Sequence, residues 1–561
     1  MNASRIASPT GRIAPATTAF RGCPGVIVFA LICISAHMTA GRAQEFDYDA
    51  QGAEVLARGP VHEAFAGMVI LDPGPGILVN IAPPDAVEEL PPEERPEGEN
   101  VSWIPGYWAW DDERSDFLWI SGTWRDLPPG RAWMAGYWSE TSQGHQWISG
   151  YWANARTRET TYLPAPPPTM ESGPNIAAPS TDYEWMPGCW VWHRGRYAWR
   201  PGYWVQGRSD WVWIPANYVW TPRGFIFVDG YWDHAVEQRG VLFAPVYFAR
   251  GSHAGRGRGY SPSVAINLAV FSDHLFLRPR YHHYYFGDYY APSYSEGGIF
   301  ASFSFQSRRS GHDPFYSHRR WQHRQDRDWE RRSGESYRNR RDNAAERPPR
   351  TWSARRGPET AAAGRAENRV QVTASVDLLL TRKASPVRFQ PVTDDERRDL
   401  ARRRQDVQRS RDERRTLEAR TQDRTHQGPG LAPRPVTVQP PKSPIVARQP
   451  SQLRPDRSPP PRPPKAPKPD LRARPQPVKR GEQPDVVEPR DRRERPRAEQ
   501  PRANTRSGAQ RDEKQLESEP PDAGKKSAPK RAKKEKKTDR KGKQSSTQEE
   551  PPAGEAAPAT P

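Results

Sequence analysis

Cysteine is scarce in this chain: Cys23, Cys33 and Cys189 are the only three among 561 residues. So few cysteines exclude a disulfide framework and a metal cluster held by thiolates. Hydrophobic residues make up only 35% of the sequence, and prolines number 62. Since much of such a chain cannot bury enough apolar surface to offset its loss of conformational entropy, we expect the folded part to be local.

Lysine is absent before Lys383, and charge is divided sharply along the chain. Residues 44–305 carry a net charge of −12, whereas residues 306–561 carry +26. This asymmetry suggests an anionic partner for the basic part, although a run of charge can also serve only to keep a segment solvated.

The N-terminus has the order of a secretory signal. Three arginines, Arg5, Arg12 and Arg21, precede an apolar run at residues 25–36, and the small residues Gly41 and Ala43 precede a cut before Gln44. We therefore predict a signal peptide over residues 1–43 and an exported protein of the periplasm, cell envelope or extracellular space. The alternative is an uncleaved segment that anchors the chain, although the run is shorter than the ~20 residues of a membrane span.

Tryptophan, by contrast, is abundant: 18 of the 21 tryptophans lie between residues 103 and 232. They recur as W-x-x-G-x-W, with copies that begin at residues 103, 119, 133, 147, 185, 199, 213 and 227. A proline-rich insert at residues 159–182 separates two blocks of four copies. The repeat positions that we single out are Trp103, Gly106, Tyr107, Trp108, Trp119, Gly122, Trp124, Trp133, Gly136, Tyr137, Trp138, Trp147, Gly150, Tyr151, Trp152, Trp185, Gly188, Trp190, Trp199, Gly202, Tyr203, Trp204, Trp213, Gly230, Tyr231 and Trp232.

A 14-residue period is too short for a pair of helices and fits one strand and one turn. Aromatic and β-branched residues flank the motifs, as strands prefer. We predict a mainly β fold, an antiparallel meander of strand–turn repeats over residues 103–248. A β-bulge with positive φ at the glycine would bring both tryptophans of a motif to one face and build an aromatic ladder. The alternative is a tight type II turn at Pro-Gly, which we favour less because several copies lack the proline.

The motifs WIPGYW, WMAGYW, WISGYW, WMPGCW and WRPGYW resemble the WXXGXW (or YXWGXW) repeat family of exported, largely uncharacterised bacterial proteins. The resemblance covers residues 103–232, which is under a quarter of the chain. It implies a repeat-containing exported protein and supplies no catalytic or binding residue.

The rest of the chain divides by composition. Residues 44–102 form an acidic, proline-rich segment with one short strand at GMVILD, and residues 249–305 add strands at 264–270 and 299–305. Residues 306–427 predict a charged helical and linker region, in which TDDE begins a polar helix exposed to solvent over 393–424. Residues 428–561 predict a disordered Pro/Lys/Arg-rich tail. Its densest basic run holds the residues expected to bind a polyanion: Lys525, Lys526, Lys530, Arg531, Lys533, Lys534, Lys536 and Lys537.

The sequence contains no convincing catalytic constellation. GSHAG at 251–255 is not a nucleophile elbow, and GRGRG is not a dinucleotide loop. The neighbours His282 and His283 would point to opposite sides of a strand, which argues against a shared metal. The carboxylates of DDERSD at 111–116 indicate a solvated hairpin turn rather than a calcium loop. We therefore expect no catalytic residue, no cofactor and no metal ligand.

These features predict a non-catalytic, exported envelope-associated protein with an aromatic β-repeat interaction domain and a polyanion-binding tail. Its partners would be an envelope glycan or envelope protein at the repeats and an anionic polymer at the tail. The tryptophans would form either the core of the sheet or a stacking face for sugar rings. A self-assembling structural envelope protein and a glycan-binding module are the alternatives; a nucleic-acid-binding protein or an enzyme is less favoured.

Overall fold

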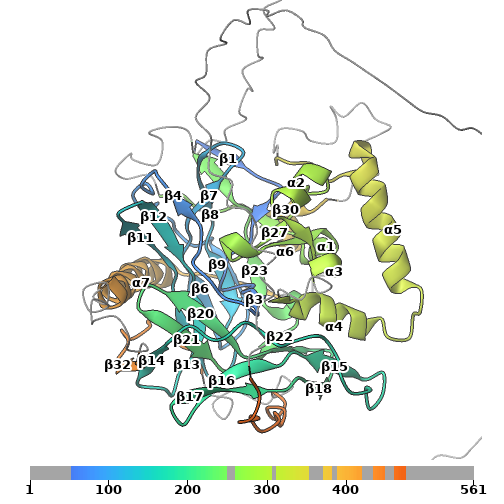
Figure 1. The fold of residues 1–561 in the computed structure, drawn as a ribbon. Helices are drawn as coiled ribbons and strands as arrows, with labels where there is room; N and C mark the ends of the chain where they lie inside the picture. The colour runs from blue at the N-terminus through green and yellow to red at the C-terminus, as the bar shows by residue number, and fades with distance from the viewer. Residues whose placement is uncertain are drawn as a thin grey trace, which may run out of the picture. The chain divides into compact units, whose positions relative to one another are not determined.

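The computed structural model describes residues 52–248, 259–305, 311–352, 371–381, 388–419, 434–448 and 460–474. The predicted signal peptide and the lysine-rich run of the tail lie outside these residues. The named strands pair in antiparallel fashion throughout, so the mainly β, antiparallel prediction is confirmed (Figure 1). The predicted short strand at GMVILD is present as β3 (Val69–Ile70).

The structural unit of the repeat is two motifs rather than one. In the first unit, β7 (Tyr107–Asp111) pairs with β8 (Asp116–Ile120), while β6 (Val101–Ile104) pairs with β9 (Thr123–Asp126). Two motifs therefore make one two-stranded ribbon, and each of its strands is interrupted at the dipeptide that contains the motif glycine. We name this unit ribbon 1 (residues 101–126).

Three further ribbons repeat this plan. Ribbon 2 (131–154) has β10 (Arg131–Met134), β11 (Tyr137–Thr141), β12 (Gly144–Ile148) and β13 (Tyr151–Asn154). Ribbon 3 (183–206) has β15 (Tyr183–Met186), β16 (Cys189–His193), β17 (Arg196–Arg200) and β18 (Tyr203–Gln206). Ribbon 4 (211–234) has β19 (Trp211–Ile214), β20 (Asn217–Thr221), β21 (Gly224–Val228) and β22 (Tyr231–His234).

Tryptophans face each other across every ribbon. Trp108 and Trp119 meet edge to face with ring centroids 5.2 Å apart, and Trp103 and Trp124 do the same at 5.2 Å. Aromatic pairs of this geometry contribute about 0.5–1.5 kcal/mol beyond the burial of their area. The corresponding pairs in the other ribbons are Trp133–Trp152, Trp138–Trp147, Trp185–Trp204, Trp190–Trp199, Trp213–Trp232 and Tyr218–Phe227.

The motif position requires glycine because a side chain there would overlap a neighbouring ring, and not because its backbone has a positive φ. The strands before and after it pair with the partner motif and not with each other, so the tight-turn alternative is wrong. The positive φ expected of a bulge is also wrong, because none of the motif glycines has one. Instead, a Cβ on Gly188 would lie 2.6 Å from the Trp199 ring, and one on Gly136 would lie 2.6 Å from the Trp147 ring. The first tryptophan of each motif thus covers the glycine of its partner.

Ribbon 4 shows the same constraint by its departure from the motif. Ala216 stands where the other ribbons have glycine, and the residue opposite in the partner motif is Phe227, in the place that Trp119, Trp147 and Trp199 hold elsewhere. A phenyl ring is smaller than an indole and leaves room for the added methyl group. Where glycine and tryptophan are both kept, a Cβ on Gly230 would lie 2.6 Å from the Trp213 ring, as in the other ribbons.

The ribbons join the flanking segments through short strands. β8 pairs with β24 (Val246–Phe248), which pairs with β1 (Ala53–Val55), and β9 pairs with β23 (Gly240–Leu242). A second sheet contains β2 (Gly59–Pro60), β27 (His283–Phe286), β26 (Leu275–Arg278) and β28 (Phe300–Ala301). Two of the four buried motif indoles of ribbon 1, those of Trp108 and Trp119, share one hydrophobic cluster with Phe276 and Tyr285 of this sheet.

Two strands predicted after the repeats are shorter than expected. The strand predicted at 264–270 is β25 (Val264–Ile266), after which Asn267 accepts from Ala269 N–H and begins α1 (Leu268–Phe271). The strand predicted at 299–305 gives way to α3 (Ser302–Phe305) after β28. The predicted hairpin turn at 111–116 is present, but Arg58 and Arg278 pair with its Glu113 and Asp112, so it is not simply solvated.

The charged C-terminal region is helical as predicted, in α4 (Pro314–Gln322), α5 (Trp329–Asp342) and α7 (Asp394–Ala419). Thr393 and Glu396 cap α7 reciprocally. The prediction that this helix lies free in solvent is wrong: Val407, Arg414 and Glu418 are buried, and α7 packs on β11 (Figure 1). Among the helices of the described segments, none combines the length and the apolar character that a membrane span requires.

Polar groups hold α7 in place. Arg414 Nε donates to Glu418 Oε1 at 3.0 Å, and its guanidinium also donates to the carbonyl oxygens of Ala135 and Ser149 in ribbon 2. The hydroxyls of Tyr137 and Tyr162 donate to Glu418. Because these partners are charged or polar, the hydrophobic pattern of the helix gave no sign of the contact.

Three stretches of the segment predicted as a disordered tail lie against the repeats or the insert between them: residues 436–438, the residues around Ile445, and residues 460–474, in which Asp470 N–H donates to the Trp199 carbonyl at 2.7 Å. β32 (Val436–Val438) pairs with β14 (Thr160–Leu163), and Ile445 is buried beside Trp133 and Trp152. Trp133 N–H donates to the Ile445 carbonyl at 2.9 Å. Proline-rich composition therefore did not prevent these stretches from packing, because backbone groups and one isoleucine make the contact.

The packing of glycine against tryptophan predicts the outcome of a double-mutant cycle. Gly188→Ala should destabilise the chain by about 2 kcal/mol, because the new methyl group overlaps the Trp199 ring. Gly188→Ala combined with Trp199→Phe, which copies Ala216 and Phe227, should be more stable than the sum of the single changes by about 1 kcal/mol or more. Denaturant unfolding measures both values.

Gly74→Ala is the matched control, since a Cβ there meets nothing within 4 Å. Strict additivity of the two changes in ribbon 3 would contradict the proposed packing.

Candidate binding site: carboxylates held by the ribbons

A glutamate from outside the repeat lies at the centre of ribbon 1. Glu89 is buried, and its Oε1 accepts from Gly122 N–H at 2.9 Å and from Trp119 Nε1 at 3.2 Å. Its Oε2 accepts from Gly106 N–H at 2.9 Å. Both glycines of the ribbon and one indole therefore converge on a single carboxylate.

Ribbons 2 and 3 hold a glutamate in the same way. Glu63 accepts from Trp147 Nε1 and Gly150 N–H, both at 2.9 Å. Glu171 accepts from Trp185 Nε1 at 3.1 Å and from Gly188 N–H at 2.5 Å. In all three ribbons the tryptophan and the glycine belong to the same W-x-x-G. We call this pair of donors the carboxylate cradle.

Other indoles of the ribbons bind the backbone of the segments that carry these glutamates. Trp108 Nε1 donates to the Asp85 carbonyl at 3.0 Å, four residues before Glu89. Trp190 Nε1 donates to the Pro168 carbonyl at 2.9 Å, three residues before Glu171. Ribbons 1 and 3 thus hold a segment at two points, a carboxylate and an upstream carbonyl, whereas in ribbon 2 the Trp138 indole donates to the Trp108 carbonyl of ribbon 1.

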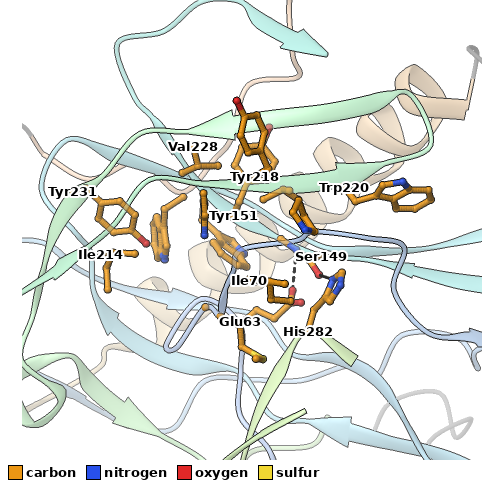
Figure 2. Close-up of a pocket in the computed structure, with 18 residues that line it drawn as sticks. Glu63, Ile70, Ser149, Tyr151, Ile214, Tyr218, Trp220, Val228, Tyr231 and His282 are labelled. Carbon is orange, nitrogen blue, oxygen red and sulfur yellow. Dashed lines mark hydrogen bonds between the residues drawn. The ribbon is translucent and has the colours of Figure 1, made fainter. Parts of the chain in front are cut away.

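The cradle of ribbon 2 borders a small cavity of about 70 Å³ (Figure 2). Ser149 Oγ and His282 Nδ1 form a hydrogen bond of 2.7 Å there, and the Glu63 carboxylate lies beside them. His282 has a φ of 58°, in the left-handed region. His283 Nε2 lies 2.9 Å from the Tyr107 hydroxyl and 3.8 Å from Glu63 Oε1. Both histidines therefore lie near the Glu63 carboxylate, His282 through Ser149 and His283 directly.

Burial controls the charges of this cluster. It lowers the pKa of His282 and of His283 to about 4, so both imidazoles are neutral near pH 7. Burial also raises the pKa of Glu63 to about 7, against the opposing effect of the N–H groups of Gly150 and Trp147. The pKa of Glu89 is raised to about 7 for the same reason, opposed by Gly122, Gly106 and Trp119.

The cluster does not have the order of a nucleophilic triad. In a triad the histidine lies between the serine and the acid, whereas here Ser149 lies between His282 and Glu63. The cavity has room for a few water molecules and is much smaller than the 300–1,000 Å³ of typical ligand pockets. A polar network that fixes Glu63 in ribbon 2 accounts for the geometry.

The structure places the motif tryptophans inside the protein. All of them are buried except Trp138 and Trp204, which are half-buried. Within the described ranges, no group of three histidine, cysteine or acidic side chains is placed to hold a metal ion. The polyanion-binding residues predicted in the tail, Lys525 to Lys537, lie outside the described residues.

Sequence reasoning missed Glu63, Glu89 and Glu171. They lie 14 to 87 residues from the groups that bind them, and single acids in proline-rich segments carry no periodic signal. A search for acids in the segments next to the repeats could have found them only if the donor geometry of W-x-x-G had been known.

The model of the family described as WXXGXW repeat (2 copies) matches residues 102–125, 130–153, 181–205 and 208–233. Residues 102–233 contain WXXGXW repeats. Each match coincides with one ribbon, so the two copies in the family description are the two motifs that pair in space. Comparison with curated proteins and with solved structures gave no match.

The cradles of these WXXGXW ribbons predict how stability depends on pH. A glutamate whose pKa rises from about 4.5 in the unfolded chain to about 7 in the fold keeps a proton that the unfolded chain releases. The free energy of unfolding should therefore fall as pH rises from 4.5 to 7, by on the order of 3 kcal/mol for Glu89. Glu89→Gln should remove this contribution, as measured by denaturant unfolding between pH 5 and 8.

Buried histidines with lowered pKa values act in the opposite direction, so the difference between wild type and variant is the quantity to compare. Glu159→Gln, at an exposed position, serves as the control. An unchanged pH profile for Glu89→Gln would contradict the account.

Proposed function

We propose that this chain is a non-catalytic scaffold protein whose WXXGXW ribbons hold acid-bearing segments from outside the repeat. The observation that carries the proposal is the recurrence of one cradle, with a glutamate from outside the repeat, in three of the four ribbons. Such a site binds and positions a chain segment, and its donors perform no chemistry.

The burial of the motif tryptophans supports this proposal over an open stacking face for sugars. Edge-to-face pairs inside the ribbons leave few indole faces for a flat ligand. Nine of the fourteen motif indoles instead donate their N–H to carboxylates or carbonyls of the chain itself. An aromatic core with polar edges is what a small β scaffold with little leucine or valine requires.

The compartment and the tail belong to the same proposal. A signal peptide at residues 1–43 would deliver the scaffold to the cell envelope or beyond, where the ribbons would engage envelope proteins. The lysine-rich run at 525–543 would bind an anionic polymer of that compartment through salt-dependent contacts. The self-assembling and glycan-binding alternatives predict different outcomes in the two experiments below.

Tryptophan fluorescence of the full chain tests the scaffold part. The emission should be blue-shifted and largely resistant to iodide, because the motif indoles are buried. Adding a panel of envelope glycans should leave both properties unchanged. Protection of quenchable indoles by one glycan would overturn the proposal in favour of a glycan-binding module. Quenching that falls with protein concentration alone would favour self-assembly.

Retention on a polyanion column tests the tail. The full chain should elute at higher salt than a chain that ends at residue 524, since the deletion removes the densest basic run. Replacing Lys525, Lys526, Lys530 and Lys533 with glutamine should give part of the same loss. Equal elution of the full and shortened chains would contradict a polyanion-binding role for these residues.

A further inference from the structure

A cavity of about 710 Å³ lies beside ribbon 3, between the proline-rich insert and the helices α4 and α5. This volume is in the range of sites that bind ligands. Trp185 and Trp204 of ribbon 3 line it, together with Trp321 and Trp329 of the helical region. Glu171, in the cradle of ribbon 3, lies at its edge.

The insert that occupies this cradle is held less firmly than the segments on ribbons 1 and 2. Those segments have buried apolar anchors, Val87 at 4% exposure and Phe65 at 1%. Between residues 164 and 181 no side chain is buried, and Ile176 is 58% exposed. Besides the Glu171 carboxylate, ribbon 3 holds the insert by indole bonds to the carbonyls of Pro168 and Ile176 and by the Tyr197 hydroxyl, which donates to the Pro164 carbonyl at 2.6 Å.

We propose that ribbon 3 and its cavity form an exchangeable site for an acidic, proline-containing extended segment of another protein. A glutamate of that segment takes the cradle of Trp185 and Gly188 that Glu171 occupies within the chain. This inference rests on the proposed function and adds to it the site and the class of partner.

The donors of the site select a peptide rather than an isolated carboxylate. The cradle takes the acid, and Trp190 takes a carbonyl three residues upstream, as Trp108 does four residues upstream in ribbon 1. Both occupants seen in these ribbons are extended and lie next to prolines, and a preformed extended chain loses little conformational entropy on binding.

The cavity is lined by three arginines, Arg320, Arg324 and Arg327, and by four acids, Glu171, Glu184, Asp326 and Glu330, so the donors of the cradle rather than the charge of the wall select an acidic segment. Arg320 is 66% exposed and Arg324 is paired with Asp182, while Arg327 makes no ion pair within the described residues. Arg320 forms an ion pair with Glu330, with Arg320 Nε 3.1 Å from Glu330 Oε1. The indoles of Trp204 and Trp321 would contact apolar side chains of the segment.

A labelled peptide of residues 164–177 and its Glu171→Gln form test the site on the full-length protein. Binding of the glutamate peptide, followed by fluorescence anisotropy, should be about tenfold tighter to the Glu171→Gln protein than to wild type, because the competing carboxylate within the chain is weakened. The glutamine peptide should bind at least about fivefold more weakly. Trp185→Phe, which keeps a ring but removes the donor, should weaken binding to a similar degree.

Glu159→Gln is the matched control and should leave peptide affinity as in wild type. Equal binding of the two peptides, or equal affinity for wild type and Glu171→Gln, would overturn the exchange. Limited proteolysis of the insert separates this failure from failure of the scaffold proposal. If Glu171→Gln speeds cleavage of the insert but does not increase peptide affinity, the cradle acts only within the chain. If Glu171→Gln changes neither the cleavage rate nor the peptide affinity, ribbon 3 does not hold its segment through the carboxylate.

Discussion

The close approach of an indole to a glycine is the constraint on which the repeat depends. In each complete ribbon the first tryptophan of one motif lies where the Cβ of the partner's glycine would be, as at Gly188 and Trp199. This contact interrupts both strands at the same level and fixes their register, with tryptophan opposite tryptophan. It also leaves the glycine N–H without a partner in the ladder. The N–H and the indole Nε1 of the same W-x-x-G then converge on one point, where a carboxylate accepts from both.

A buried carboxylate is costly unless donors replace its water. Here backbone and indole N–H groups of the ribbon supply them. The arrangement ties segments distant in sequence to the repeat, since Glu63 lies 87 residues from Gly150. Arginine completes the polar interior: Arg125 and Arg239 both pair with Asp233, and Arg414 joins α7 to ribbon 2. The absence of lysine from residues 44–305 suits this interior, because the planar guanidinium can satisfy several acceptors at once.

The local pattern of the repeat was predictable, and its long-range partners were not. Period, aromatic content and turn-like connections predicted antiparallel strands, because these depend on neighbours in sequence. The pairing of motifs in twos could have been read from Ala216 and Phe227, which change together. The glutamates of the cradles and the docking of α7 depend instead on single polar residues such as Glu418, whose partners Tyr137 and Tyr162 lie more than two hundred positions away. Hydrophobic periodicity does not register such contacts.

Ribbon 4 indicates that the motif is kept for the carboxylate as well as for packing. Its first motif has Trp213 but Ala216, and its second has Gly230 but Phe227, so neither contains a complete W-x-x-G. If packing alone mattered, this paired exchange would be neutral, since Tyr218 and Phe227 still meet at 5.1 Å. Yet ribbon 4 is the one ribbon of the described structure for which no bound glutamate is seen, and Trp232 Nε1 donates there to the Arg462 carbonyl. The bond from an indole to a backbone carbonyl is thus kept in a ribbon that lacks a complete cradle. The carbonyl contact and the carboxylate contact therefore do not depend on each other. In the described structure, each ribbon with a complete W-x-x-G holds a glutamate at one of its two motifs, and ribbon 4, which has no complete copy, holds none.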